Sequence, residues 1–257
     1  MDKLKIISWN VNGIRAAARK GFLNWIEEEK PDILCLQEIK AMENQLTEDI
    51  RKPQNYNVVW NPALRAGYSG TALFSRLKLP GTKNKLGVKE YDDEGRTIIA
   101  DFGGCVLING YYPNGRNDLS RVPFKLRYYD EMIKTASKLV SAGRNVVLTG
   151  DFNTAHREID LARPAQNVNN TGFLPEERAK IDELIEAGFA DTYRNFHSGG
   201  GNYSWWSYRG GARERNVGWR LDYFFVNKSF MKSVEESYML PLVQGSDHCP
   251  VVLILRP

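Results

Sequence analysis

The sequence predicts an α/β fold in a single domain, with two β-sheets packed face to face and helices outside them. Short apolar runs with strand character occur in both halves of the chain and are interleaved with few helical segments. No linker rich in proline or serine divides the 257 residues, and no solenoid repeat is present. We therefore expect residues 1–257 to form one layered domain.

The first strands end in polar residues. Residues 4–9 are rich in strand formers and lead into Asn10-Val11-Asn12-Gly13. Residues 22–30 carry apolar side chains at helical spacing and stop at a proline, which predicts a helix. The apolar run 32–37 predicts a buried strand that delivers Glu38 at its end.

The middle of the chain contains β-type segments separated by turn signals, at 56–60, 71–74, 96–102 and 106–112. Residues 123–140 show one apolar face at helical spacing. The apolar run 145–149 predicts a central buried strand that stops at Gly150 and is followed by Asp151 and Asn153.

Asp151 and Asn153 lie two residues apart, so on an extended backbone their side chains point to the same side. A carboxylate beside an amide suits hard metal ions, activated water and phosphate oxygens. An isolated Asp-x-Asn is more often a turn that caps a strand, but polar residues also end other strands. Asn10 and Asn12 have the same spacing, which indicates either an internal duplication or a coincidence.

The C-terminal part begins with a polar, asparagine-rich loop at 155–174. Pro175 opens a helix that Gly188 closes. Residues 219–226 and 250–255 are expected to be the closing strands.

Composition places mild limits on function. The net charge of +4 permits a polyanionic partner without requiring one. The three cysteines occur singly in apolar contexts, which indicates buried thiols in a reducing cytoplasm. No apolar run is long enough to span a membrane and no secretory signal is recognisable, so we expect a cytoplasmic protein without membrane attachment.

The polar residues at predicted strand ends form the candidate catalytic set. They are Asn10, Asn12, Glu38, Tyr111, Asp151, Asn153, Asp222, Asp247 and His248.

This set fits hydrolysis of a phosphodiester. Glu38, with Asp151 or Asp247, offers oxygen ligands for Mg²⁺, and Asp151 is placed to accept a proton from water. His248, next to Asp247 and paired with Asp222, would face a phosphoryl oxygen. Phosphate esters hydrolyse so slowly that catalysis must supply roughly 20 kcal/mol. Neither a G-x-S-x-G nor an H-E-x-x-H motif is present, which argues against a serine hydrolase or a zincin.

A second group of residues lies between Tyr203 and Phe225, where three tryptophans are interleaved with four arginines. Arginines bind phosphates and aromatic faces stack on bases or pack against sugars. A tryptophan core with a solvated arginine rim is the alternative, but the density of both residue types favours a nucleic-acid face.

These residues form motifs that occur in one order along nearly the whole chain. The motifs are Ser8-Trp9-Asn10-Val11-Asn12-Gly13, Leu36-Gln37-Glu38, Tyr111-Tyr112-Pro113-Asn114, Gly150-Asp151-Phe152-Asn153, Asn216-Val217-Gly218-Trp219-Arg220-Leu221-Asp222-Tyr223 and Gly245-Ser246-Asp247-His248-Cys249-Pro250. Together they resemble the exonuclease III family of apurinic/apyrimidinic endonucleases, within the endonuclease/exonuclease/phosphatase superfamily.

The resemblance implies a four-layered α/β sandwich with two mixed sheets. It also implies Mg²⁺-dependent hydrolysis 5′ to an abasic site in double-stranded DNA, with 3′→5′ exonuclease and 3′-end-cleaning activity on blocked 3′ ends. Mn²⁺ is expected to substitute for Mg²⁺, and the protein is expected to be a monomer that acts in base excision repair.

The resemblance also assigns residue roles. It implies the catalytic residues Tyr111, Asp151, Asn153, Asp222 and His248. It implies the metal-site residues Asn10, Glu38, Asp151, Asn153, Asp247 and His248. It implies the DNA-binding residues Asn12, Asn114, Arg116, Asn167, Asn170, Trp205, Arg209, Trp219 and Leu221. Trp205 and Arg209 occupy positions that vary in the family, which leaves the balance of endonuclease and exonuclease activities open.

Two rival functions remain. A phosphatase of inositol phosphates or a sphingomyelinase would belong to the same superfamily but has no need of the tryptophan and arginine segment. A DNA-binding module without catalysis does not explain carboxylates at the strand ends, since acids repel phosphates unless a metal is bound.

Overall fold

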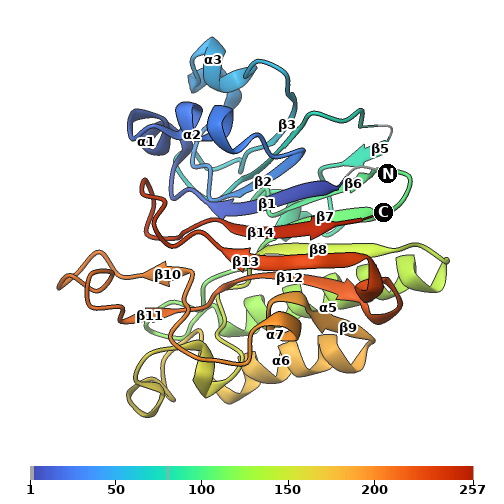
Figure 1. The fold of residues 1–257 in the computed structure, drawn as a ribbon. Helices are drawn as coiled ribbons and strands as arrows, with labels where there is room; N and C mark the ends of the chain where they lie inside the picture. The colour runs from blue at the N-terminus through green and yellow to red at the C-terminus, as the bar shows by residue number, and fades with distance from the viewer. Residues whose placement is uncertain (1–2, 80, 257) are drawn as a thin grey trace.

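The computed structural model describes residues 3–79 and 81–256 and contains two mixed six-stranded sheets that face each other (Figure 1). The first sheet has the order β13 (Val234–Met239), β14 (Val251–Leu255), β1 (Leu4–Asn10), β2 (Ile33–Gln37), β4 (Thr71–Ser75) and β3 (Asn57–Asn61). The second has the order β5 (Gly81–Lys83), β6 (Thr97–Asp101), β7 (Val106–Tyr111), β8 (Val146–Asp151), β12 (Asp222–Asn227) and β9 (Phe189–Asp191). A separate ribbon pairs β10 (Trp205–Trp206) with β11 (Gly218–Trp219).

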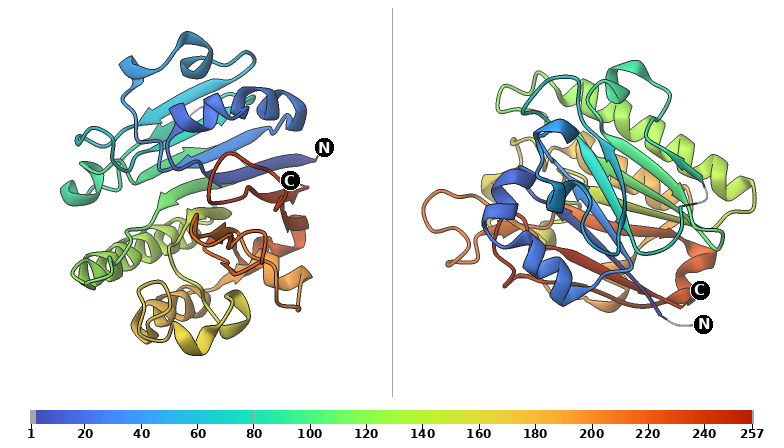
Figure 2. Two further views of the ribbon diagram at one scale, coloured as in Figure 1. Left: turned by 90° about the vertical axis from the view of Figure 1, so that its left-hand side faces the viewer. Right: turned by 90° about the horizontal axis from the view of Figure 1, so that it is seen from above.

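Helices lie on the outer sides of the two sheets, which completes the expected four-layered α/β sandwich (Figure 2). The helices are α1 (Ile14–Arg19), α2 (Phe22–Glu29), α3 (Glu48–Arg51), α4 (Lys89–Asp92), α5 (Val122–Ser141), α6 (Pro175–Glu186) and α7 (Thr192–Phe196). Short 3₁₀ turns occur at Glu43–Gln45, Glu158–Asp160, Pro164–Gln166 and Lys228–Ser233. The predicted helices correspond to α2, α5 and α6, whereas α1, α3, α4 and α7 were not predicted.

Strand alternation decides which side chains enter the space between the sheets. On β1, Ile7 and Trp9 pack outward with α1 and α2, whereas Ile6 belongs to the core between the sheets. On β8, Val147 belongs to that same inner core and Leu148 packs outward with α5. Because alternate residues share a face, Asn10 and Asp151 both point into the inter-sheet space, at the end where their strands stop.

The two sheets repeat one arrangement, which supports internal duplication over coincidence. In the first sheet, β1 lies between the parallel strand β2 and the antiparallel strand β14. In the second sheet, β8 lies in the same way between the parallel strand β7 and the antiparallel strand β12. Asn12 and Asn153 both have positive φ, 44° and 50°. Each backbone N–H donates to the side chain two residues earlier, at 2.9 Å to Asn10 Oδ1 and 2.8 Å to Asp151 Oδ1.

Two predicted strands end differently in the structure. The central strand does not stop at Gly150 but continues to Asp151, paired with β7 and β12. The segment 219–226 is not one strand, because the Leu221 N–H donates to Ser204 Oγ at 2.9 Å instead of joining the ladder. β11 therefore ends before this break and β12 begins after it.

The three cysteines are buried, as the apolar sequence around each of them predicts. Cys35, Cys105 and Cys249 are buried free thiols, and burial raises the pKa of each. Within residues 3–79 and 81–256, no helix has the length and apolar character needed to cross a membrane.

Gly150 is required by a close approach of two strands. Its φ is 137°, and a Cβ at this position would lie 1.8 Å from the carbonyl oxygen of Gly110. Only glycine therefore lets β8 pair with β7 immediately before Asp151.

Replacing Gly150 by alanine should destabilise the fold by about 3 kcal/mol or more, because strain and a backbone clash add. Gly143→Ala is the matched control, since Gly143 also has a positive φ of 79° but a Cβ there would meet no packed atom within 4 Å. The control should lose only about 1–2 kcal/mol. Urea unfolding measures both, and equal losses would contradict the close-approach explanation.

Candidate active site

A cleft of about 480 Å³ opens at the end of the inter-sheet space where β1 and β8 stop. It is lined by residues of β7 and β8 in the second sheet, by the loops after β1, β2, β7 and β8, by the β10–β11 ribbon with Leu221 after it, and by the turn before β14. The lining residues are Asn12, Glu38, Lys40, Tyr111, Asn114, Asn117, Asp151, Asn153, Thr171, Gly172, Trp205, Trp219, Leu221, Asp247 and His248. Most of the predicted site residues are therefore brought together in one cleft.

Asn10 joins the two halves of this site. Its buried side-chain amide donates one hydrogen bond to Glu38 Oε2 at 3.0 Å and another to Asp151 Oδ2 at 2.8 Å. Its own oxygen accepts from the Asn12 N–H. The amide therefore holds a carboxylate from each sheet at a set separation while remaining beneath the cleft surface.

Asp151 is a buried carboxylate with hydrogen bonds on both oxygens. Besides Asn10, it accepts from the backbone N–H of Asn153 at 2.8 Å and from the Asn153 side chain at 3.3 Å. Burial raises the pKa of Asp151 to about 7, although the charge of His248 opposes the rise. A carboxylate with a pKa near neutrality is suited to accepting a proton.

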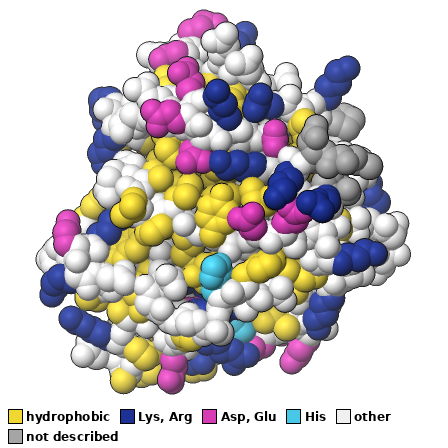
Figure 3. Space-filling model, in the orientation of Figure 1, with side chains coloured by type: hydrophobic (Ala, Val, Ile, Leu, Met, Phe, Trp, Pro, Cys, Tyr) yellow, Lys and Arg dark blue, Asp and Glu magenta, His cyan; other side chains and the backbone are white. Residues whose placement is uncertain are grey.

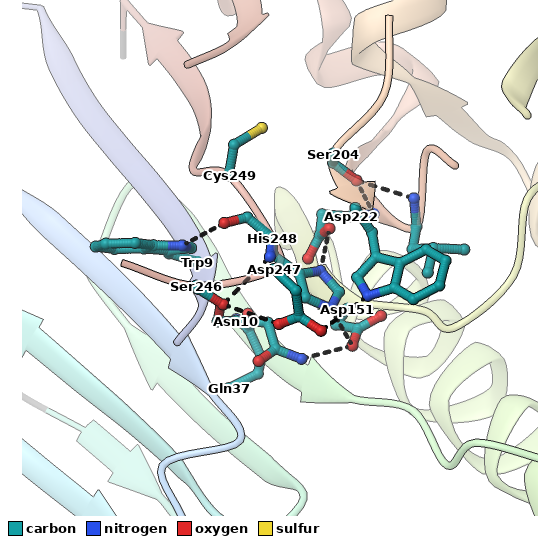
Figure 4. A network of polar contacts seen from close by, with 12 residues as sticks. Trp9, Asn10, Gln37, Asp151, Ser204, Asp222, Ser246, Asp247, His248 and Cys249 are labelled. Atoms are coloured by element: carbon teal, nitrogen blue, oxygen red, sulfur yellow. Dashed lines mark hydrogen bonds and ion pairs between the residues drawn. The ribbon is translucent and has the colours of Figure 1, made fainter. Parts of the chain in front are cut away.

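His248 lies between two carboxylates (Figure 4). Its Nδ1 is 2.8 Å from Asp222 Oδ2, and its Nε2 is 3.8 Å from Asp151 Oδ2. Burial alone would lower the pKa of His248, but Asp222 and Asp151 outweigh it and raise the pKa to about 10. The ring is therefore an imidazolium at neutral pH, with Nε2 directed toward the cleft side of Asp151.

Asp247 is held from two directions. Its carboxylate accepts from the Asn12 amide at 2.9 Å and from the Trp205 indole N–H at 3.0 Å. Burial alone would raise the pKa of Asp247, but His248 and these hydrogen bonds leave it below the usual range. Asp247 therefore remains charged at the cleft wall.

Tyr111 closes the cleft beside the carboxylates. Burial, followed by the charges of Glu38 and Asp151, raises the pKa of Tyr111 well above its ordinary value. The Arg96 guanidinium lies 4.9 Å from the Tyr111 ring centre and donates to the Tyr111 carbonyl at 2.8 Å. The phenol is therefore kept neutral, as a hydrogen-bond donor.

The donor set fits a hard divalent cation. Three carboxylates line the cleft, those of Glu38, Asp151 and Asp247, against the two cations Lys40 and His248. Mg²⁺ needs only one or two carboxylates because it keeps several waters, and Glu38 is partly exposed to the cleft.

The role of His248 at the metal site stays a prediction. Ligand atoms of Asp151, Asp222 and His248 lie within 4.8 Å of one another, which makes this cluster a possible metal site. A protonated imidazole has no lone pair to offer a metal, so coordination by His248 would require loss of its Nε2 proton. Glu38 and Asp247 offer further carboxylate oxygens in the same cleft.

The apolar wall of the cleft is formed by Trp205, Trp219 and Leu221. The two indoles meet edge to face, with ring centres 6.3 Å apart, and both pack against a small core that includes Leu221. Asn114 reaches the site through a 3.1 Å hydrogen bond to Asn153 Oδ1. The remaining predicted DNA-binding residues lie outside the cleft lining, namely Arg116, Asn167, Asn170 and Arg209.

Part of the tryptophan and arginine segment is structural, so not every residue of the segment can belong to the predicted nucleic-acid face. Arg220 is fully buried and binds Asp160 and Asp191, each at 2.7 Å, so it cannot reach a phosphate. Trp206 is also buried, and Arg213 lies over its ring at 4.7 Å. On the face shown in Figure 3, Lys and Arg side chains are mixed with acids and form no continuous stripe.

Sequence reasoning missed Lys40 and Ser246. The Lys40 ammonium is 2.7 Å from Glu38 Oε1 and also donates to Asn12. Ser246 donates from its hydroxyl to the Asn10 carbonyl at 2.7 Å. Lys40 follows Glu38 by two residues, so the same spacing that identified Asp151 and Asn153 would have indicated it.

Comparisons with known proteins identify the family of this chain. The model of the endonuclease/exonuclease/phosphatase family matches residues 7–248. An exodeoxyribonuclease of Bacillus subtilis is 44% identical over 98% of this chain and 100% of its own. A DNA-(apurinic or apyrimidinic site) endonuclease of Dictyostelium discoideum is 37% identical over 99% of this chain and 71% of its own.

A solved structure shows the same fold. The AP endonuclease of Archaeoglobus fulgidus matches with a TM-score of 0.89 and 31% identity, covering 99% of this chain and all of that one. The resemblance inferred from the motifs is therefore confirmed, and the chain belongs to the endonuclease/exonuclease/phosphatase family, in its exonuclease III branch of apurinic/apyrimidinic endonucleases.

Proposed function

We propose that this protein is a DNA-repair nuclease that hydrolyses the phosphodiester 5′ to an abasic site in duplex DNA and also trims 3′ ends. The observation that carries the proposal is the arrangement of Asp151, His248 and Asp222 at a cleft with an apolar wall, where His248 Nε2 lies 3.8 Å from Asp151 Oδ2 and Nδ1 lies 2.8 Å from Asp222 Oδ2. The names of the relatives from Bacillus subtilis and Dictyostelium discoideum support both activities.

The residues divide the work between proton transfer and charge stabilisation. Asp151 accepts the proton of the attacking water, and Asn153 keeps the carboxylate oriented. His248, whose other nitrogen is held by Asp222, directs its Nε2 proton at the negative charge that develops on the phosphoryl oxygens. The neutral Tyr111 phenol offers a further proton at the same position.

Mg²⁺ is the cation we propose for this site, held by Glu38 with Asp151 and replaceable by Mn²⁺. Its charge would offset the three carboxylates of the cleft, which otherwise repel the phosphate.

The tryptophan wall supports selection of an abasic nucleotide. Trp205, Trp219 and Leu221 offer an apolar surface large enough for a sugar next to the catalytic carboxylates. A nucleotide without a base has little stacking to lose when it leaves the helix. We expect a monomer to be sufficient, because one chain supplies every residue of the cleft.

The direct test is incision of a duplex with one abasic site, in the presence of MgCl₂ or EDTA. We expect a single cut on the 5′ side that leaves a 3′-hydroxyl, and no cut with EDTA. An intact duplex of the same sequence is the control for selectivity. Absence of incision with Mg²⁺, or equal cutting of the intact duplex, would refute the proposal.

Asp151→Asn should lower kcat by about 10²- to 10⁴-fold, because an amide cannot accept the proton of water. Its affinity for abasic duplex should remain within a few-fold of wild type, since the asparagine side chain has nearly the same shape and size as the aspartate side chain. Asp130→Asn, which changes an exposed acid on α5, is the matched control. Single-turnover rates and a binding titration measure both quantities, and near-normal turnover of Asp151→Asn would rule out its role as the base.

A further inference from the structure

Arg213 joins two loops, one of which contains Asp247 and His248. It lies in the loop 207–217 between β10 and β11, and its guanidinium donates to carbonyls of the loop 240–250 between β13 and β14. The distances are 3.1 Å to Ser246, 2.8 Å to Pro241 and 2.6 Å to Val243. Among the described residues, no carboxylate lies within ion-pair distance of Arg213, so these carbonyls are its main partners.

Ser246 transmits this anchoring to the site (Figure 4). Its hydroxyl donates to the Asn10 carbonyl at 2.7 Å and accepts from the His248 N–H at 3.2 Å. The same hydroxyl lies 3.2 Å from Asp247 Oδ1. A shift of the Ser246 backbone would therefore displace both side chains that follow it.

Arg213 also supports the other side of Asp247. Its guanidinium lies 4.7 Å from the centre of the Trp206 ring, and the Trp206 backbone N–H donates to the Asp247 carbonyl at 3.0 Å. At the tip of the loop 240–250, Leu242 is 89% exposed, whereas Leu240 and Val243 pack against the core. The Arg213 guanidinium therefore ties this tip to the loop between β10 and β11.

We infer that Arg213 is a positioning residue, which sets the place of Asp247 and His248 by holding the loop 240–250 against the β10–β11 ribbon. This inference rests on the proposed function for its rate readout. Small displacements of a catalytic group lower turnover strongly while leaving substrate binding less affected. Arg213 should therefore act on kcat and not on KM.

The experiment compares Arg213→Ala with Arg215→Ala. Arg215 is an exposed residue of the same loop, whose Nε contacts only the Gly211 carbonyl at 3.4 Å, so the control removes the same charge from the same loop. We expect Arg213→Ala to lower kcat on abasic duplex by about 10- to 100-fold with KM within about three-fold. Arg215→Ala should keep the wild-type kcat, and any contact that Arg215 makes with a phosphate should appear in KM alone.

Arg213→Lys provides a second variant that keeps the charge. One ammonium cannot span three carbonyls as a planar guanidinium does, so kcat should stay well below wild type. A normal kcat in Arg213→Ala, or a loss confined to KM as in a simple phosphate contact, would overturn the inference. Full rescue by lysine would show that charge and not the fork matters, and would overturn it as well.

Hydrogen–deuterium exchange tests the same inference without catalysis. The amides of residues 244–249 should exchange faster in Arg213→Ala than in wild type, and at the wild-type rate in Arg215→Ala. Equal exchange in all three proteins would overturn the inference. Failure of wild type to incise DNA would refute the proposed function alone, because the exchange comparison does not depend on it.

Discussion

The burial of the Asp151 carboxylate where the two sheets meet is the constraint on which the site depends. Strand alternation directs Asp151 inward from β8 and Asn10 inward from β1, and the Asn10 amide bonds to Asp151 at 2.8 Å and to Glu38 at 3.0 Å. Neither sheet alone holds both carboxylates. The packing of the two sheets therefore creates the catalytic geometry. Within the second sheet, Gly150 lets β8 pair closely with β7 up to Asp151.

Burial also determines the charges of the site. A carboxylate taken out of water favours its neutral form, which brings the pKa of Asp151 to about 7. His248 is equally buried but faces Asp222 and Asp151, so its charged form is favoured. One environment thus produces a base and a cation side by side, as hydrolysis of a phosphodiester requires.

The sequence allowed prediction of most strands and of most cleft residues, because these depend on local signals, whereas β5, β9, β10 and β13 were not predicted. Asp151 and Asn153 follow an apolar run, and strand periodicity alone places them on one side. Arg220 was misassigned because its partner Asp160 lies 60 residues away and only the fold brings them together. Arg213 escaped prediction for a similar reason, since its partners are carbonyl groups, which carry no residue-type signal.

The most direct measurement of the central claim is an NMR titration of the His248 ring in metal-free protein. We predict a pKa well above 6.5, near 10, so that the ring stays charged from pH 6 to 8. The corresponding stabilisation of the fold is fully present below pH 6.5 and is lost as pH rises through the folded-state pKa. Asp222→Asn should lower the pKa markedly. A ring that titrates near 6.5 in both proteins would contradict the account.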